Sequence, residues 1–492
     1  MNERARNKLS SQWVALTILC GGVAIRFVEW FHCRDLMMDE VNVVRNIFER
    51  PYDGLFRPLA YEQFAPPLFL SMVKATSTLG GFSEMSLRLF PILCSILSLF
   101  VFYRLVLVFA GKRSLWYPLA IFSFAEIYIQ YANDVKQYSS DILVSLLLVF
   151  LAVKRGLFSS SRFQFFLQWS LIGMIAVWLS MPSIFILTGV GISLFIQAYN
   201  DRQTRYLLPL IGAGILWMLS FAGYYWLLLR HQIASEYLQL FHAPYFLNLS
   251  NGKDLFDSHN IGLMAAFFSS TIGSGRHFPF FLNLALLLVG FYSILRNNAT
   301  KGLVLLIPIF CFLAAVAMHR FTLLPRVGLF VMPILLIVVG VGLEALLTIR
   351  VWFQWLTVAA CVISAGYSQQ LRLFTSRIEI DELTKEIAFA RKNKVSNHQI
   401  FLPELYEPNL IYYTKIHPNK TRAKSYDSIQ ILKWKTNYTA LRSGIVNRSA
   451  FIYFWMDDGT MQRHRDSIFS FFQPIDSFVQ PSYKVFVFDQ KR

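Results

Sequence analysis

The sequence predicts a polytopic α-helical membrane protein that ends in a small α/β domain. Three observations support this prediction. Charged residues make up 15% of the 492 residues, against about 25% in an ordinary soluble domain. Apolar runs suited to crossing a bilayer recur along residues 1–370. From residue 371 the chain becomes polar and alternates short apolar strands with amphipathic helices.

We expect about eleven membrane-spanning helices, because a spanning helix needs roughly 20 mostly apolar residues. Two further apolar segments, 66–80 and 261–272, are shorter and are expected to lie at the membrane interface or to re-enter it. The expected spans are 13–31, 89–110, 115–131, 138–153, 166–180, 183–199, 206–229, 279–295, 302–318, 327–348 and 352–369.

The distribution of Lys and Arg predicts which side of the membrane each loop faces. Basic residues precede the first span and recur in the short loops on that same side. Cytoplasmic loops are enriched in Lys and Arg, so the N-terminus is expected in the cytoplasm, with the protein in the inner (plasma) membrane. The long loops 32–85 and 230–278 then face outside. An odd number of spans also places the domain 371–492 outside.

In the tail, three segments are expected to form buried strands: HQIFLP, SAFIYFWM and YKVFVFD. Two segments are expected to form helices, IEIDELTKEIAFARKN and TMQRHRDSIFSFF. About 120 residues are enough for a small α/β domain with its own core.

The formal net charge of +17 does not indicate a nucleic-acid partner, because the basic residues lie in short clusters between apolar runs. Such clusters are typical of membrane topology and of contact with anionic membrane lipid. The five cysteines show no disulfide framework and no metal spacing. There is no Walker loop, GxGxxG or HExxH motif, so hydride transfer and ATP hydrolysis are not supported.

An acidic pair, Asp39 and Glu40, follows the first span in the segment CRDLMMDEVNVVRNIF. Adjacent residues point in different directions, so only one of the two is expected to face a site. A carboxylate at this boundary is suited to deprotonating an acceptor hydroxyl or to holding a divalent metal. The alternative is a solvated pair of loop residues.

A second candidate is the segment IYIQYANDVKQYSSD, which places Asp134, Lys136 and Tyr138 near the outer headgroups. Charges at this depth are costly unless they are paired or hydrated. We expect Lys136 to pair with a lipid phosphate and Asp134 to accept hydrogen bonds from a sugar or an acceptor. The alternative is a set of ordinary interfacial charges.

A third candidate is MHRFTLLPRVGLFVMP, with His319, Arg320 and Arg326 on the outer side, where positive charge is less expected. An arginine fork matches phosphate oxygens, so these residues are candidate phosphate ligands. The alternative is a nonspecific headgroup contact. We favour that alternative for Arg276 in TIGSGRHFP.

The order of these motifs resembles the GT-C superfamily of membrane glycosyltransferases. The nearest resemblance is to family-39-like enzymes, which are related to protein O-mannosyltransferases and the lipid A aminoarabinose transferase. It covers residues 1–370 and rests on five segments in order. They are the DE pair, QFAPPLFLSMV, SLRLFPILCSILSLFVFYRL, YANDVKQY and LLPRVGLFVMP.

This resemblance implies a GT-C-like fold and a polyprenyl-phosphate-linked sugar as donor, transferred with inversion outside the cytoplasm to a protein, lipid or glycan. Asp39 matches the catalytic carboxylate, and Glu40 would support that base or hold a metal. In the match to YANDVKQY, Asp134 stands where the family has a glutamate, and Lys136 stands where it has an arginine. A lysine lacks the bidentate fork of an arginine. Arg326 matches an arginine that binds the donor phosphate.

Tyr138 and Arg320 complete the candidate donor-binding residues. The sequence shows no cofactor requirement, and a divalent metal stays an option.

Two other functions compete with the transferase. A transporter or lipid-glycan flippase would be expected to show inverted repeats or broken helices at the midplane, and the sequence shows neither. A scaffold whose tail binds a partner would make Asp39 dispensable.

Overall fold

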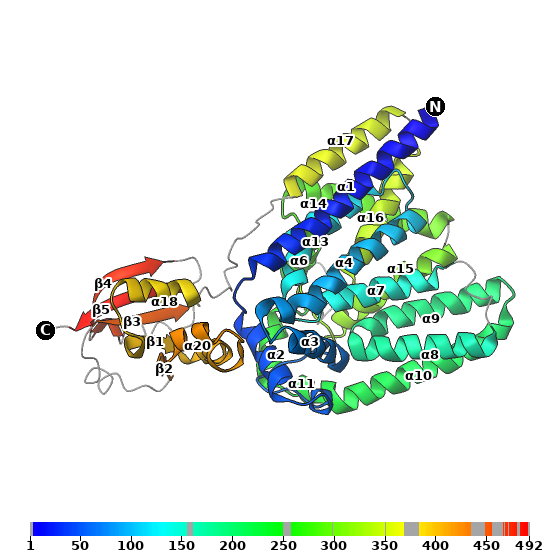
Figure 1. Ribbon diagram of the computed structural model, residues 1–492. Coiled ribbons are helices and arrows are strands. Elements are labelled where there is room, and N and C mark those ends of the chain that lie inside the picture. Colours follow the sequence, from blue (N-terminus) through cyan, green and yellow to red (C-terminus); the bar gives the residue numbers. More distant parts are fainter. Residues whose placement is uncertain are drawn as a thin grey trace. The chain divides into compact units, whose positions relative to one another are not determined.

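In the computed structural model the chain folds into two compact units, each built from several segments (Figure 1). One comprises Met1–Phe31, Tyr52–Val73 and Arg88–Leu373, and the other comprises His32–Pro51, Lys74–Leu87 and Phe374–Arg492. The structure describes residues 3–154, 161–248, 257–297, 299–349, 351–368, 383–433, 448–454, 466, 468–470, 472–479 and 483–490.

Long apolar helices dominate the first unit, and the protein is a multi-pass membrane protein. Seven helices within the described residues are long and apolar enough to cross a membrane. Figure 1 shows three of them, α8, α9 and α10, side by side. The seven are α1 (Glu3–His32), α4 (Glu84–Phe109), α8 (Arg162–Leu179), α9 (Ser183–Asn200), α10 (Leu207–Tyr224, continued through a π-helical turn into α11, Arg230–Ile233), α14 (His277–Asn297) and α15 (Ala299–Ala317).

Shorter helices complete the part of the chain before the tail. They are α2 (Met38–Glu49), α3 (Pro67–Leu79), α5 (Trp116–Phe124), α6 (Glu126–Gln130), α7 (Tyr138–Ala152), α12 (Glu236–His242), α13 (Ser258–Ile272), α16 (Met332–Leu346) and α17 (Val351–Ser368).

The number of long spans is smaller than the eleven expected, because several expected spans are broken or short. The chain bends by 112° between Glu126–Asn133 and Tyr138–Ala152, and this pair adds an eighth span if it is counted as one. Ala125 and Asp134 have extended backbone angles that end the preceding helical segments. Two apolar helices near the end of the unit, Met332–Leu346 and Trp352–Gly366, are shorter than the usual span.

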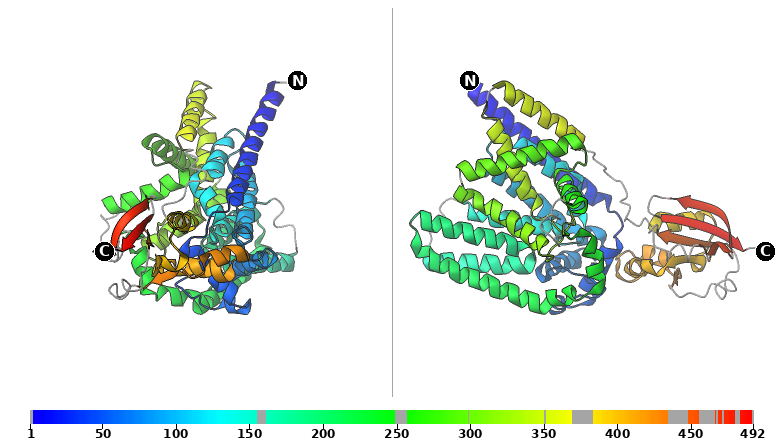
Figure 2. Two further views of the ribbon diagram at one scale, coloured as in Figure 1. Left: turned by 60° about the vertical axis from the view of Figure 1, so that its left-hand side comes forward. Right: turned by 180° about the vertical axis from the view of Figure 1, so that it is seen from behind.

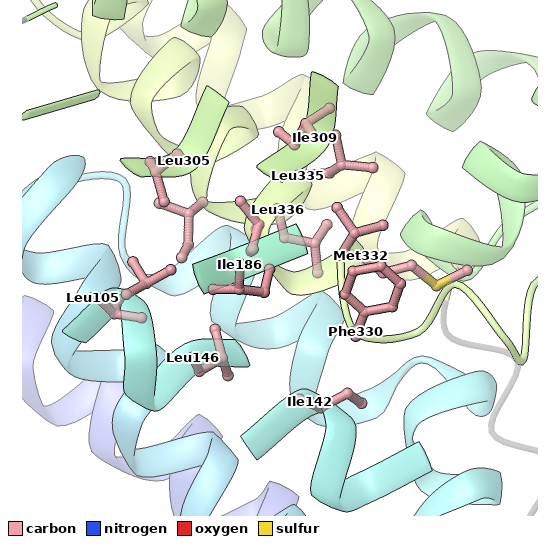
Figure 3. Packing of buried hydrophobic residues seen from close by; sticks show 14 of the residues in the cluster. Leu105, Ile142, Leu146, Ile186, Leu305, Ile309, Phe330, Met332, Leu335 and Leu336 are labelled. Atoms are coloured by element: carbon pink, nitrogen blue, oxygen red, sulfur yellow. The ribbon is translucent and has the colours of Figure 1, made fainter. Parts of the chain in front are cut away.

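Helix α16 lies at the centre of the apolar core. Every residue from Met332 to Leu343 is buried, as expected for a helix that is apolar on all sides. Figure 3 shows its side chains among those of α4, α7, α9 and α15.

Two glycines let α14 and α16 pack backbone against backbone. A Cβ atom on Gly342 would lie 1.9 Å from the Leu286 carbonyl oxygen, and one on Gly290 would lie 2.1 Å from the Val338 carbonyl oxygen. Small residues allow this close approach between helices in membranes.

A buried arginine fastens α1 to its neighbours. Arg26 donates hydrogen bonds to Ser95 Oγ and to the carbonyl oxygens of Gly22, Ser123 and Phe122, at 2.8–3.1 Å. These bonds compensate for placing a charge inside an apolar bundle.

The tail of the second unit contains a five-stranded mixed sheet, drawn as red and orange arrows in Figure 2. Its strand order is β2-β1-β3-β5-β4, in which β1 pairs in parallel with β2 and β3, while β5 is antiparallel to β3 and β4. Its elements are α18 (Leu383–Lys392), β1 (Ile400–Pro403), α19 (Glu407–Ile411), α20 (Lys420–Tyr426), β2 (Gln430–Leu432), β3 (Ser449–Phe454), β4 (Phe472–Val479) and β5 (Tyr483–Gln490).

The small C-terminal α/β domain is confirmed, and β1, β3 and β5 coincide with the three expected strands. Helix α18 covers the later part of one expected helix, and Ile380 at its start lies outside the described residues. In the other expected helix, Ile468–Ser470 are helical but Phe472 begins β4. That strand went unrecognised because most of its side chains are exposed and it contains a proline.

Candidate functional site

The acidic pair lies in the first turn of α2, and its two members have different surroundings. Glu40 is buried, and its Oε2 atom accepts hydrogen bonds from Arg34 Nη1 at 2.7 Å and from the Met37 backbone N–H at 2.9 Å. Asp39 is partly exposed, and its carboxylate has no hydrogen-bond or ion-pair partner within the described residues. Asp39 is therefore the member of the pair whose carboxylate is partly exposed and not committed to another described residue.

Helix α2 is fixed at both ends within the second unit. At its C-terminal end, Lys74 Nζ donates to the carbonyl oxygens of Ile47 and Arg50 at 2.6 and 2.7 Å. Burial lowers the pKa of Lys74. At the N-terminal end, Asn409 Nδ2 donates to the Leu36 carbonyl oxygen at 3.0 Å. These bonds hold the backbone that carries Asp39.

The motif YANDVKQY forms the sharp break between α6 and α7. Asp134 is 3% exposed and extended. The rings of Tyr131 and Tyr138 meet edge to face with centroids 5.0 Å apart, and Ser139 Oγ donates to the Tyr131 carbonyl oxygen at 2.9 Å. The motif thus folds back on itself and fixes the position of the Tyr131 ring.

Lys136 contacts a turn that precedes α3. Its Nζ atom donates to Gln63 Oε1 at 2.7 Å. The neighbouring Tyr61 and Glu62 have left-handed backbone conformations, with φ of 64° and 51°. This turn lines a polar pocket of about 220 Å³ together with His231 and other residues of the α10–α12 region.

Arg326 lies in a second, larger hollow of about 570 Å³. It is lined by one face of α6, by the C-terminal end of α13 with the following loop, and by the segment before α16. We call it the arginine hollow, because Arg276 and Arg326 both line it. The other lining residues are Glu126, Ile127, Gln130, Tyr131, Ser269, Ser270, Gly273, Ser274, Gly275, Leu324 and Pro325.

The surroundings of Arg326 are partly aromatic. Its guanidinium lies over the ring of Phe241, 5.3 Å from the centroid. The adjacent His242 has a buried Nδ1 atom with no hydrogen-bond partner in the described part of the chain. Burial, and secondarily the charge of Arg326, lower the pKa of His242.

The structure brings some of the sequence candidates together and separates others. Arg326 and Tyr131 of the YANDVKQY motif share the arginine hollow, whereas Lys136 contacts the smaller pocket. Arg320 is exposed at the end of α15 and is not among the residues lining the hollow. Asp39 and Glu40 belong to the other unit.

The sequence alone favours a nonspecific lipid contact for Arg276. The structure places Arg276 in the same hollow as Arg326. The signal that could have identified it is the serine- and glycine-rich segment around it, SSTIGSGR, which supplies small side chains next to a cation. For metals, no three His, Cys, Asp or Glu side chains of the described residues lie close enough together to hold an ion.

Comparison with known proteins identifies the fold. No family model matches the chain, and no curated protein does. The chain resembles the solved structure of ArnT from Cupriavidus metallidurans in the apo state, with a TM-score of 0.52 and 12% identity over 97% of this chain and 98% of that one. It also resembles ArnT of the same organism bound to undecaprenyl phosphate, with a TM-score of 0.51 and 14% identity over the same shares.

The chain has a GT-C-like fold. This confirms the fold and the resemblance expected from the motif order. ArnT, the lipid A aminoarabinose transferase, is a GT-C enzyme.

Proposed function

We propose that the protein is a membrane glycosyltransferase that moves a sugar from a polyprenyl-phosphate-linked donor to an acceptor. The observation that carries this proposal is the arginine hollow, which is lined by Arg276, by Arg326 and by Tyr131 of the YANDVKQY motif. A similar solved structure holds undecaprenyl phosphate, which supports a donor of this class.

On the donor side, Arg276 and Arg326 would bind the phosphate. Guanidinium groups match phosphate oxygens through paired N–H donors. Ser269, Ser270 and Ser274 line the same hollow and add hydroxyl groups. Tyr138 would act by holding the Tyr131 ring, which it contacts edge to face, and Asp134 would accept hydrogen bonds from the sugar.

In the proposed reaction, the acceptor hydroxyl gives its proton to Asp39 and its oxygen attacks the anomeric carbon. Attack from the side opposite the phosphate inverts the configuration. The bond between the anomeric carbon and the phosphate oxygen breaks, and its electron pair stays on the phosphate. Arg276 and Arg326 would stabilise this additional negative charge.

Asp39 is suited to the role of base because its carboxylate is not committed to another group in the described structure. Glu40 would support it by fixing the start of α2 through Arg34 and Met37. The proposal places the reaction on the extracytoplasmic face, with the N-terminus in the cytoplasm. It assigns residues 1–370 to the transferase domain and 371–492 to an extracytoplasmic domain.

The test is turnover of a panel of radiolabelled polyprenyl-phosphate sugars by purified protein in liposomes. We expect Asp39→Asn to lower turnover by about 100-fold or more, the usual contribution of a general base, while donor binding is retained. Asp201→Asn is the matched control, because Asp201 is an exposed carboxylate that follows α9. Undiminished turnover in Asp39→Asn would refute its role as base.

Donor binding is tested separately with polyprenyl phosphate. Arg276→Gln and Arg326→Gln should each weaken binding, whereas Arg320→Gln should weaken it less because Arg320 does not line the hollow. If Arg320→Gln has the largest effect, the arginine hollow is not the phosphate site. If no donor is bound or consumed by the wild type, the transferase proposal fails.

A further inference from the structure

The first turn of α7 carries a buried carboxylate that the proposed reaction does not use. Asp141 is 5% exposed, and its Oδ1 atom has no hydrogen-bond partner among the described residues. No Lys, Arg or His of the described chain forms an ion pair with it. The buried Arg26 provides a contrast, since four hydrogen bonds compensate its charge.

The groups around Asp141 are hydroxyls rather than cations. The hydroxyl group of Ser180, in the turn between α8 and α9, lies close enough to the Asp141 carboxyl group to interact with it, yet no hydrogen bond of normal geometry joins the two. Tyr224 at the end of α10 is close enough to be influenced by the charge of Asp141. The hydroxyl oxygens of Ser180 and Tyr224 are themselves buried and without hydrogen-bond partners in the described structure.

Two more buried hydroxyl groups without hydrogen-bond partners among the described residues lie on α7 and α9. Ser145 follows Asp141 by one turn on α7, so the two share a helix face. Ser183 begins α9, directly after the turn that carries Ser180. Both Oγ atoms are buried and unpartnered among the described residues. Buried polar atoms nearly always have a partner, so such a group indicates a bound water or ion.

The energetic cost of burying the Asp141 carboxylate indicates which kind of ligand would balance it. An ionisable residue inside a membrane bundle is expensive unless it is paired, and it marks a functional site. One carboxylate supplies one negative charge, which a single monovalent cation balances. Hydroxyl and carboxylate oxygens are the ligands that hard cations prefer. A divalent ion would call for further acidic ligands, and the described residues contain no acidic cluster of that kind.

We propose that Asp141, Ser180 and Tyr224 form a binding site for a monovalent cation, with sodium as the ion. The site would join the start of α7, the α8–α9 turn and the end of α10, since α7 contacts both α8 and α9, and both of these contact α10. Because α7 begins directly after Lys136 and Gln137, the ion would also hold the YANDVKQY motif in place. Binding of the ion does not itself require the proposed transferase reaction.

The experiment measures the thermal unfolding midpoint of the purified protein while sodium chloride replaces choline chloride at constant ionic strength. A ligand that binds only the folded state stabilises it in proportion to the logarithm of its concentration above Kd. We expect the wild-type midpoint to rise with sodium by several degrees. Asp141→Asn, which keeps the shape of the side chain, should lose this dependence, and Asp201→Asn should keep it.

Milder variants cover the case in which Asp141→Asn fails to fold. Ser180→Ala and Tyr224→Phe should raise the half-saturating sodium concentration about three- to tenfold, the value of one hydrogen bond. Equal wild-type midpoints in sodium and choline would overturn the proposal. So would a sodium dependence that survives in Asp141→Asn, or one that none of the three substitutions alters.

Discussion

Lys136 donates a hydrogen bond from Nζ to Oε1 of Gln63 at 2.7 Å. The bond joins the YANDVKQY motif to a turn in which Tyr61 and Glu62 both have positive φ. Residues other than glycine rarely adopt this conformation, and it persists only when the surroundings enforce it. On the other side of the turn, Ser235 Oγ donates to Glu62 Oε2 at 2.7 Å. Lys136 is therefore one of the contacts that hold a strained turn.

If Lys136 acts through Gln63, substitutions of the two residues should have non-additive effects on kcat/KM. Lys136→Met and Gln63→Leu should each lower kcat/KM roughly tenfold or more, in line with a hydrogen bond to a charged group. The double variant should be no worse than the worse single variant, because coupled residues are not additive. Additive losses would mean that Lys136 contacts the donor phosphate directly, as its place in the motif predicts.

Substitution of Glu40 should mainly lower stability, whereas substitution of Asp39 should mainly lower turnover. Glu40→Gln removes the carboxylate that pairs with the largely buried Arg34, so the free energy of unfolding should fall by about 1–3 kcal/mol. Turnover should fall far less than in Asp39→Asn. The measurement is thermal unfolding alongside turnover of each variant. A loss of turnover in Glu40→Gln without a loss of stability would give Glu40 a direct role at the site.

Local patterns explain how much of the fold the sequence predicts. Helices such as α4 and α14 follow from continuous apolar runs, since hydropathy depends only on nearby residues. The break at Ala125, inside the expected span 115–131, does not follow, because the extended backbone of this buried residue is stabilised by tertiary packing that no local pattern encodes. For the same reason α16 looked like an ordinary span, although burial on all sides makes it the central helix of the core.

Part of the proposed site follows from residue type and position in the sequence. Arg326 is a candidate because it is a cation on the side of the membrane where positive charge is less expected. Arg276 is not, because its significance depends on Tyr131 and Arg326, which are distant in sequence and adjacent only in the folded hollow. For Asp39 and Glu40 the sequence predicts only that adjacent side chains point in different directions. It does not predict which of the two is buried.

The crossing of α14 and α16 should be intolerant of any side chain. In Gly342→Ala the new methyl group would collide with the Leu286 carbonyl oxygen, and overpacking of this kind costs about 1–3 kcal/mol. Gly214→Ala on α10 is the control, because nothing lies within 4 Å of the Cβ position there. Thermal unfolding in detergent should separate the two. Equal midpoints would show that the helices can part at no cost.

His242 should give the folded protein a pH dependence that its substitution removes. Burial and Arg326 lower its pKa below the ordinary value of 6.5, so between the lowered pKa and 6.5 the unfolded chain binds more protons than the folded one. Stability should therefore be constant above pH 6.5 with respect to this group and fall as the pH drops through that window.

The measurement is the unfolding midpoint of wild type and His242→Gln between pH 5 and pH 8, where the range is chosen to span the titration of histidine. The variant should lose less stability on acidification than the wild type. His231→Gln, at an exposed histidine of α11, should leave the wild-type profile unchanged. Arg326→Gln should weaken the dependence, because it removes the positive charge that opposes protonation of His242. Identical profiles for wild type and His242→Gln would show that His242 has the same proton affinity in the folded and unfolded states.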